Sequence, residues 1–352
     1  MPIYWPIKNF DKNAKKRTIA GISALRRYRE KNIPDRTLKS TLLLATWNLR
    51  DLGNEDKRGQ PDGQGYPGPR LEESYYYIAE IISSFDIVAI QEINSLTALD
   101  KIMEILGQSW DYLVSDINPS QGGNFEHMTF VFDKTKVRFS HMTGQIVTEG
   151  KNQFVRTPYY AAFQSGWFKF SLCTVHILYG SFKDLGPRIE EIDEIAKFLS
   201  DRVKRTGENM ILLGDFNIID RNDATFKPFK DHGWTVPMSF KTNVKKNKEY
   251  DQIAFKTKPK ELKRGPSKPN AGAYDFFKSV FKMKDWETYY EVAKATGRRM
   301  DSWDVTERWP QKDRVLTHKE YFEQWRTWQI SDHMPLWLEL EIDFTDDYLG
   351  RI

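Results

Sequence analysis

Short apolar segments of strand length recur along the chain, and each stands beside polar residues of the kinds that enzymes use. Four segments precede such residues: 42–46 before Asn48, 86–90 before Gln91 and Glu92, 171–175 before His176, and 210–214 before Asp215 and Asn217. Two more follow them: 252–255 after Asp251, and 334–342 after Asp332 and His333. Buried strands present such side chains at their ends, so we predict that these groups lie along one edge of a sheet and form the active site.

Helical segments alternate with these strands. The clearest are 75–83, 96–106 and 189–203, and their alternation with strands predicts an α/β fold. Residues 1–40 form an N-terminal extension with a basic helix at 18–31, in which Ile19, Ile22 and Leu25 recur at a spacing of three. Pro34 ends this helix. The sequence has no internal repeat and no nucleotide-binding glycine fingerprint.

From residue 41 to 352 we expect one large domain, because two-sheet enzymes reach this size as a single unit. In 257–329 the alternation gives way to a charged insertion with five tryptophans: Trp286, Trp303, Trp309, Trp325 and Trp328. Packing in the core is the default interpretation of a tryptophan, and stacking on a substrate is the alternative. We expect this insertion to set specificity.

The composition is that of a folded protein from a reducing compartment. Hydrophobic residues make up 39% and aromatic residues 14%, which is enough for a sizeable core. Cys173 is the single cysteine, so an intrachain disulfide and a thiolate metal cluster are excluded, in agreement with a cytoplasmic location. Neither an apolar signal-peptide run nor a stretch of eighteen apolar residues occurs, so we expect no secretion and no membrane span.

Charge is concentrated in one stretch of the chain. The net charge of +4 does not by itself identify a nucleic-acid-binding protein. Residues 241–268, however, contain ten Lys or Arg residues against three acidic ones, with Lys245, Lys246 and Lys248 close together. A solvated loop and a surface that faces phosphates are both open interpretations of this stretch.

The segment Gly214-Asp215-Phe216-Asn217 offers a carboxylate and an amide directly after an apolar strand. Alternate side chains of a strand point the same way, so the two groups can address one water molecule. Hydrolysis of a phosphodiester needs a base for the attacking water and a neighbour that fixes it in line. An Asx turn that ends the strand is the alternative interpretation.

Glu92 ends an apolar run and fits a ligand of Mg²⁺, which prefers hard oxygen atoms and uses one or two protein carboxylates. Asp332, beside His333, offers a second carboxylate. No closely spaced histidine pair suggests zinc, so Mg²⁺ or Mn²⁺ is the predicted cofactor.

The two histidines, His176 and His333, are candidates for a catalytic role. If a carboxylate holds one or both protonated, they can neutralise a phosphorane-like transition state or assist the leaving group. Glu126 and Asp251 are the candidate carboxylates. For an isolated histidine such as His176, a structural role is the alternative.

Six motifs occur in the order found in the endonuclease/exonuclease/phosphatase family. They are TWNLR at 46–50, IQEI at 90–93, TVHI at 174–177, GDFN at 214–217, YDQIAF at 250–255 and SDHMP at 331–335. A single GDFN is a weak signal, but six ordered motifs are a strong one. The resemblance covers roughly residues 42–342.

This resemblance implies a four-layer α/β/β/α sandwich, in which two packed mixed sheets are flanked by helices and the site lies where the sheets meet. Matched motif positions imply that Glu92 is the principal metal ligand, with Asn48 and Asp332 near the metal or the phosphate. They further imply roles for five residues: Asp215 activates water, Asn217 positions it, His176 and His333 bind the scissile phosphate, and Asp251 orients His333.

Within the family, the chain is similar to the deoxyribonuclease branch. There a glutamate before an FVY-like strand pairs with the first histidine, and here Glu126 stands before the strand 129–132. Arg156 and Arg50 occupy places of arginines that contact phosphate. Asn94 departs from the branch, whose arginine at this place enters the minor groove, so reading of duplex DNA is not implied.

The residues and the resemblance together predict a metal-dependent phosphodiester hydrolase. A nuclease, endo- or exonucleolytic and acting on DNA rather than RNA, is the leading prediction. A phosphatase or phosphodiesterase for a small head group, such as an inositol phosphate or a phospholipid, is the alternative because the same core serves both reactions. A non-catalytic nucleic-acid-binding module is disfavoured, since every expected metal-binding and water-positioning residue is present.

Overall fold

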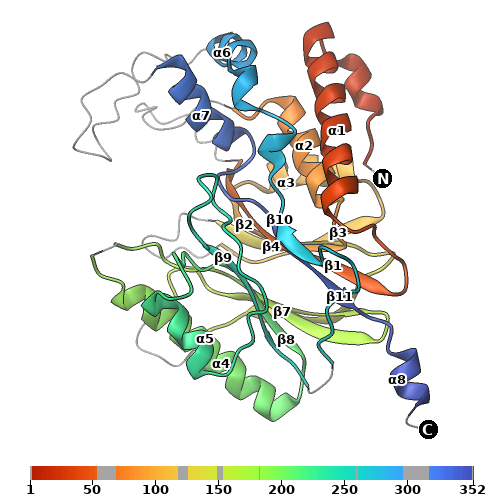
Figure 1. Cartoon of the computed structure of the whole chain (residues 1–352), viewed down its shortest axis with the longest axis vertical. Helices are drawn as coiled ribbons and strands as arrows, with labels where there is room; N and C mark the ends of the chain where they lie inside the picture. Colours follow the sequence, from red (N-terminus) through yellow and green to blue (C-terminus); the bar gives the residue numbers. More distant parts are fainter. Residues whose placement is uncertain are drawn as a thin grey trace.

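Two β-sheets pack face to face at the centre of the molecule, and helices cover the outer face of each sheet (Figure 1). The computed structural model describes residues 2–53, 69–117, 126–148, 154–181, 183–258, 261–295, 317–350 and 352. Apolar side chains of both sheets, such as Leu44 and Phe130 from one and Phe163 and Leu213 from the other, form one cluster between them. The predicted α/β/β/α sandwich is therefore observed.

Within the described residues, the first sheet has six strands in the order β10-β11-β1-β2-β4-β3. β1 and β2 are parallel and the other neighbours are antiparallel, so this sheet is mixed. The strand bounds are Thr41–Leu52 for β1, Ile87–Ile93 for β2, Trp110–Val114 for β3, His127–Asp133 for β4, Ala271–Ala273 for β10 and Leu336–Glu341 for β11.

The second sheet, over the same described part of the chain, has five strands in the order β5-β6-β7-β8-β9. It is also mixed, with β7 parallel to β8 and the other neighbours antiparallel. The strand bounds are Arg138–Gln145 for β5, Tyr159–Ser165 for β6, Phe168–His176 for β7, Met210–Asp215 for β8 and Asp251–Lys256 for β9.

β1 illustrates why the apolar runs are continuous. Leu42 and Leu44 face the second sheet, whereas Leu43, Ala45 and Trp47 face the helices on the outer side. Successive side chains of a strand point to opposite faces, so the part of β1 that is covered on both faces has apolar side chains at consecutive positions, 42–45.

Helices are divided between the two outer faces (Figure 1). The first sheet is covered by α1 (Lys12–Asn32), α2 (Glu72–Ile82), α3 (Leu96–Leu106), α6 (Trp286–Ala295) and α7 (His318–Gln329), and the second by α4 (Gly186–Thr206) and α5 (Lys227–Asp231). The short helices are α8 (Thr345–Leu349) and the 3-10 turns η1 (Trp5–Asn9), η3 (Ala224–Phe226), η4 (Phe276–Lys278) and η5 (Met283–Asp285). The helices expected at 75–83, 96–106 and 189–203 are confirmed. In the described part of the chain, none of the helices has the length and apolarity needed to cross a membrane.

The N-terminal helix α1 packs on α2. It begins at Lys12, earlier than predicted, because the Asp11 side chain accepts hydrogen bonds from the first free backbone amides. Ile22 and Leu25 are buried, but Ile19 is exposed, so the spacing of three does not mark the buried face. The buried positions are Thr18, Gly21, Ile22 and Leu25, which follow the helical period of 3.6.

Part of the segment 257–329 belongs to the core of the sandwich. β10 pairs with β11, and Trp325 of α7 is buried against aromatic residues of α6 and of the loop before it. Core packing, the default interpretation, therefore holds for Trp325. Trp286 and Trp328 are half-buried, and Trp303 and Trp309 lie outside the described residues.

Candidate active site

The predicted site residues come together at one end of the sandwich, but from both sheets. Asn48 of β1 lies beside Gln91 of β2 in the first sheet, whereas His176, Asp215 and Asp251 are paired neighbours in the second. The prediction of one edge of a single sheet was therefore wrong. Apolar runs reveal strands and their ends, but they do not say which sheet a strand joins.

Asn48 links the two sheets through its side chain. Its Nδ2 donates to Glu92 Oε1 at 2.7 Å and to Asp215 Oδ2 at 3.1 Å. Its Oδ1 accepts the backbone N–H of Arg50 at 2.8 Å, and the N–H of Asp51 binds Glu92 Oε2 at 2.8 Å. Arg50, Asp51 and Glu92 all have positive φ, a conformation that costs energy in non-glycine residues and is concentrated at functional sites.

His176 is held by a buried acid and a buried arginine. Its Nδ1 lies 2.6 Å from Glu126 Oε1, and the same oxygen lies 2.5 Å from Arg156 Nε. Its Nε2 faces the site, 3.6 Å from Glu92 Oε1 and 3.7 Å from Asp215 Oδ2. Burial, reinforced by the Arg156 charge, lowers the pKa of His176 to about 4, so this imidazole is neutral at pH 7.

His333 has the opposite electrostatic character. Its Nδ1 lies 2.9 Å from Asp251 Oδ2, and its Nε2 lies 3.7 Å from Asp215 Oδ2. Burial alone would lower the pKa of His333, but the nearby Asp251, Asp215 and Asp332 carboxylates raise it well above its usual value. The site therefore contains one neutral and one cationic imidazole.

Asp215 uses its two oxygens differently. Oδ1 accepts the N–H of Asn217 at 2.9 Å, which is the Asx turn named above as the alternative, while Oδ2 faces Asn48 and both histidines. Asn217 Nδ2 donates to Ile177 O at 2.8 Å, which fixes the amide. Gly214 is required here, because a Cβ would lie 2.1 Å from Val175 O.

The donor set fits a divalent cation. One nitrogen of Asn48 binds both Glu92 Oε1 and Asp215 Oδ2, so two carboxylates lie close together where a cation would offset their repulsion. Burial, with Asp51 and Glu126 nearby, raises the pKa of Glu92 to about 7. Among the residues that the structure describes, two sets of groups have ligand atoms within 4.8 Å of one another: Glu92, Glu126 and His176, and Asp215, Asp251 and His333.

Arg50 and Asp332 lie at the border of the site and contact each other. Arg50 Nη1 is 3.6 Å from Asp332 Oδ2 and hydrogen-bonds to Thr327 of α7, and its guanidinium stacks 4.0 Å from the Trp328 ring centre. Burial would raise the pKa of Asp332, but the Arg50 and His333 charges lower it. Asp332 belongs to neither set of potential metal ligands in the described residues.

Sequence reasoning missed several residues that support the site. Ser331 Oγ donates to Asn48 O at 2.6 Å and accepts the N–H of His333 at 2.9 Å, which ties the His333 segment to β1. Tyr250 stacks on the His333 ring, with 5.5 Å between centroids. Ser331 and Tyr250 stand inside the quoted motifs, and this adjacency was the available signal for them. Trp328 gave none beyond its residue type.

Part of the basic stretch borders the site. We name residues 243–248 the lysine turn. Val244 N donates to Asp332 O at 3.0 Å and Asn243 pairs with His333, so the turn adjoins the catalytic segment. Lys246 is paired with Asp275 at 2.6 Å, whereas Lys245 is exposed. Asn243 Oδ1 accepts the N–H groups of residues 247 and 248 at 2.9 Å, which fixes the shape of the turn.

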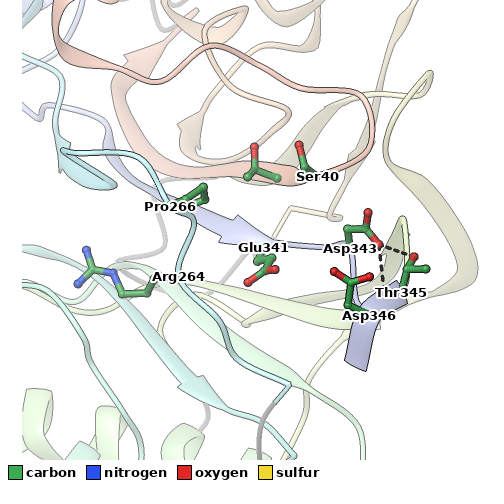
Figure 2. A pocket seen from close by; sticks show the side chains of 8 residues that line it. Ser40, Arg264, Pro266, Glu341, Asp343, Thr345 and Asp346 are labelled. Atoms are coloured by element: carbon green, nitrogen blue, oxygen red, sulfur yellow. Dashed lines mark hydrogen bonds between the residues drawn. The ribbon is translucent and has the colours of Figure 1, made fainter. Parts of the chain in front are cut away.

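A separate cavity of about 290 Å³ lies at the other end of β1 and β11 (Figure 2). Thr41 and Glu341 line it, whereas Asn48 stands seven residues further along β1, roughly 23 Å away at the rise of a strand. Asp343 in this cavity accepts hydrogen bonds from Thr345. None of its lining residues belongs to the candidate site.

Comparison with known proteins agrees with this fold. No protein-family model matches the chain. A deoxyribonuclease of Thioalkalivibrio sp. (strain K90mix) is 28% identical over 193 residues, which are 52% of this chain and 48% of that protein. The chain thus spans about half the length of this relative.

A solved structure shares the architecture. An endonuclease/exonuclease/phosphatase family protein from Bacteroides thetaiotaomicron is 20% identical, with a TM-score of 0.50 over 86% of this chain and 98% of that chain. The mannosyl-6-phosphatase Bt3783 of B. thetaiotaomicron VPI-5482 is 20% identical over 85% and 99%, and a humanized D. rerio TDP2 is 11% identical over 85% and 98%, each with a TM-score of 0.49. The chain has the fold of the endonuclease/exonuclease/phosphatase family, which confirms the predicted resemblance and architecture.

Proposed function

We propose that the chain is a divalent-metal-dependent phosphoesterase, and specifically a nuclease that hydrolyses phosphodiester bonds of DNA. The observation that carries the first part is the position of Asp215 Oδ2, which faces Asn48 Nδ2 at 3.1 Å and the Nε2 atoms of His176 and His333 at 3.7 Å. A base, an amide and two imidazoles thus converge beside Glu92, as an in-line attack by water requires.

The proposed reaction is direct hydrolysis. Asp215 orients a water molecule and takes its proton while the water oxygen bonds to phosphorus and the bond to the leaving oxygen breaks. The leaving oxygen takes up a proton from solvent water, and Asp215 releases its own proton to solvent. Asn217 holds the turn on which Asp215 sits and positions the water. The His333 cation binds the phosphate as negative charge builds up, and the neutral His176 contacts another phosphate oxygen.

Mg²⁺ or Mn²⁺, held by Glu92 with Asn48 and Asp332 close by, would supply Lewis-acid stabilisation of the phosphate. Glu126 fixes His176 and Asp251 fixes His333. Arg50 and Arg156 are the proposed phosphate-binding arginines.

The lysine turn supports a polymeric substrate. It is hydrogen-bonded through Val244 to the segment that carries Asp332 and His333, and the exposed Lys245 is the next residue. Contacts with phosphates beyond the scissile one are what distinguish a nucleic acid from a small ester. The similarity to a deoxyribonuclease supports the same choice.

A phosphatase or phosphodiesterase for a small head group is the second candidate. It is favoured by the ion pairs of Lys246 with Asp275 and of Lys241 with Glu249, which reduce the positive field of the basic stretch. Such a substrate needs only the groups of the site itself.

A substrate panel separates the two candidates. The purified protein is incubated with Mg²⁺ or Mn²⁺ and plasmid DNA, single-stranded DNA, RNA, inositol phosphates or sphingomyelin. We expect cleavage of DNA that chelator abolishes and that Asp215→Asn reduces by about two to four orders of magnitude. Hydrolysis of a small ester alone would replace the nuclease by the second candidate, and full activity in excess chelator would reject metal dependence.

A further inference from the structure

Tyr179 is an exposed aromatic residue that stands beside the site and has no role in the hydrolysis described above. It follows β7 by three residues and is 39% exposed, whereas most large aromatic side chains of the described core are buried. Exposed aromatic rings that are rigidly held near a catalytic centre are typical of binding surfaces.

A buried arginine holds Tyr179 in place. The guanidinium of Arg188, on α4, lies 5.0 Å from the centre of the Tyr179 ring and is itself only 1% exposed. Arg188 donates hydrogen bonds to three backbone carbonyls, those of Leu178, Tyr179 and Asn217. The same side chain therefore holds both the loop that carries Tyr179 and the turn that carries the catalytic Asn217.

A second tyrosine connects Tyr179 to the reacting centre. Tyr250 meets Tyr179 edge to face, with 6.3 Å between centroids, and stacks on His333 at 5.5 Å. Tyr179 thus lies two ring contacts from the imidazole that binds the scissile phosphate. These two contacts keep the Tyr179 ring within about 12 Å of the His333 ring.

We propose that Tyr179 is a stacking subsite for the nucleobase next to the scissile phosphate. This inference rests on the proposed nuclease function and adds to it that a base is bound on the His333 side of the site. A ring already fixed by Arg188 and Tyr250 loses little side-chain freedom when a base stacks on it. Stacking of this kind tolerates every base, so the subsite gives affinity for nucleotides without sequence preference.

The test uses single-stranded oligonucleotides with one cleavable phosphodiester among phosphorothioate linkages. The nucleoside on the 5′ side or the 3′ side of that linkage is either intact or replaced by an abasic tetrahydrofuran. For the wild-type chain, removing the base on one side should lower kcat/KM by about 5-fold to 150-fold, the range for one stacked base. In Tyr179→Leu the ratio of kcat/KM for the intact substrate to kcat/KM for the abasic substrate should fall to near one. Tyr179→Phe should retain the wild-type ratio.

A control variant and a purely structural role of Tyr179 give different results in the same experiment. Tyr348→Leu removes another exposed aromatic residue, which lies in α8 and packs on Trp167, and should leave the ratio unchanged. If Tyr179 only braces Tyr250 and His333, Tyr179→Leu will slow intact and abasic substrates equally, which overturns the stacking subsite. Equal rates for intact and abasic substrates in the wild type overturn it as well.

Binding separates this inference from the nuclease proposal. The affinity of the Asp215→Asn variant for the same oligonucleotides is measured in Mg²⁺, with and without Tyr179→Leu. If binding depends on the base, Tyr179→Leu abolishes that dependence and the wild type cleaves nothing, the stacking subsite is retained and the nuclease function is rejected. Cleavage and binding without base dependence would retain the nuclease and reject the subsite.

Discussion

At the residue scale, the two imidazoles of the site are held in different charge states by their neighbours. His176 lies against Arg156 as well as Glu126, and burial with that positive charge lowers its pKa to about 4. His333 faces Asp251 and Asp215, which raise its pKa against the effect of burial. A phosphate therefore meets one positive and one neutral group, which differ in what they can do with a proton.

The charge of His333 gives a pH prediction. Asp251→Asn removes the first of the carboxylates that raise the pKa of His333, so the imidazole loses its proton at lower pH. If the cation is the active form, the alkaline limb of the kcat profile should move down by about 1–3 pH units. The profile is measured beside Asp275→Asn, whose carboxylate pairs with Lys246 and whose profile should match the wild type. An unmoved limb in Asp251→Asn would contradict a role for cationic His333.

Glu92 gives a prediction about the metal. Glu92→Gln removes an anionic ligand while it preserves the shape of the side chain, so half-maximal activity should need at least about tenfold more Mg²⁺. The measurement is an Mg²⁺ titration of the rate, with Mg²⁺-induced thermal stabilisation as an independent readout. Glu341→Gln, in the cavity at the other end of β11, is the matched control and should respond to Mg²⁺ like the wild type. Equal titrations for Glu92→Gln and the wild type would contradict the assignment.

At the element scale, the strands and helices could largely be predicted from the sequence. The contacts between side chains of different elements could not. The buried run of β1 is apolar on both faces, and the boundaries of α3 were predicted to the residue. The contacts of Glu126 with His176 and of Asp251 with His333 followed from the resemblance, not from any local pattern. Arg50 and Trp328 meet only because α7 packs over β1, and no sequence period records that contact.

Glu191, in the first turns of α4, gives a prediction about stability that is independent of catalysis. Glu191 accepts the N–H of Leu178 at 2.9 Å, and burial raises its pKa from the ordinary value of 4.5 to about 7. Because the pKa of Glu191 is higher in the folded chain, this group stabilises the folded chain fully at pH values below its pKa in the unfolded chain. The contribution is lost as pH rises from about 4.5 to about 7. The loss amounts to about 3 kcal/mol at most.

Replacing Glu191 by Gln removes the titrating group and keeps an acceptor for Leu178. The free energy of unfolding, measured by urea denaturation at pH 4.5 and pH 7.5, should therefore fall more for the wild type than for Glu191→Gln as pH rises. Other groups that titrate in this range contribute equally to both proteins and cancel in the difference. An identical pH dependence of the two proteins would show that Glu191 ionises at its ordinary pKa.

At the scale of the whole molecule, charge is arranged so that the basic stretch is only partly available to a substrate. Lys241 and Lys246 are paired with acids, whereas the tip of the lysine turn presents Lys245 beside the site. The sequence alone left two interpretations of this stretch open, because a count of lysines does not reveal which ones meet a carboxylate. The structure shows paired lysines, Lys241 and Lys246, and an exposed one, Lys245, in the same stretch.

This arrangement predicts how activity responds to salt. A nucleic acid that crosses the site and contacts Lys245 releases counterions, so log(1/KM) for single-stranded DNA should fall linearly with log[salt]. Lys245→Gln should reduce the magnitude of that slope by about 0.7, the value for one phosphate contact on a single strand. Lys246→Gln should change it less because Asp275 already neutralises this lysine, and Lys204→Gln, near the end of α4, should leave it unchanged. Kinetics across a salt series for the wild type and these three variants is the measurement. A flat response in the wild type, with Lys245→Gln indistinguishable from it, would mean that the substrate neutralises charges only within the site, as a small phosphorylated head group does.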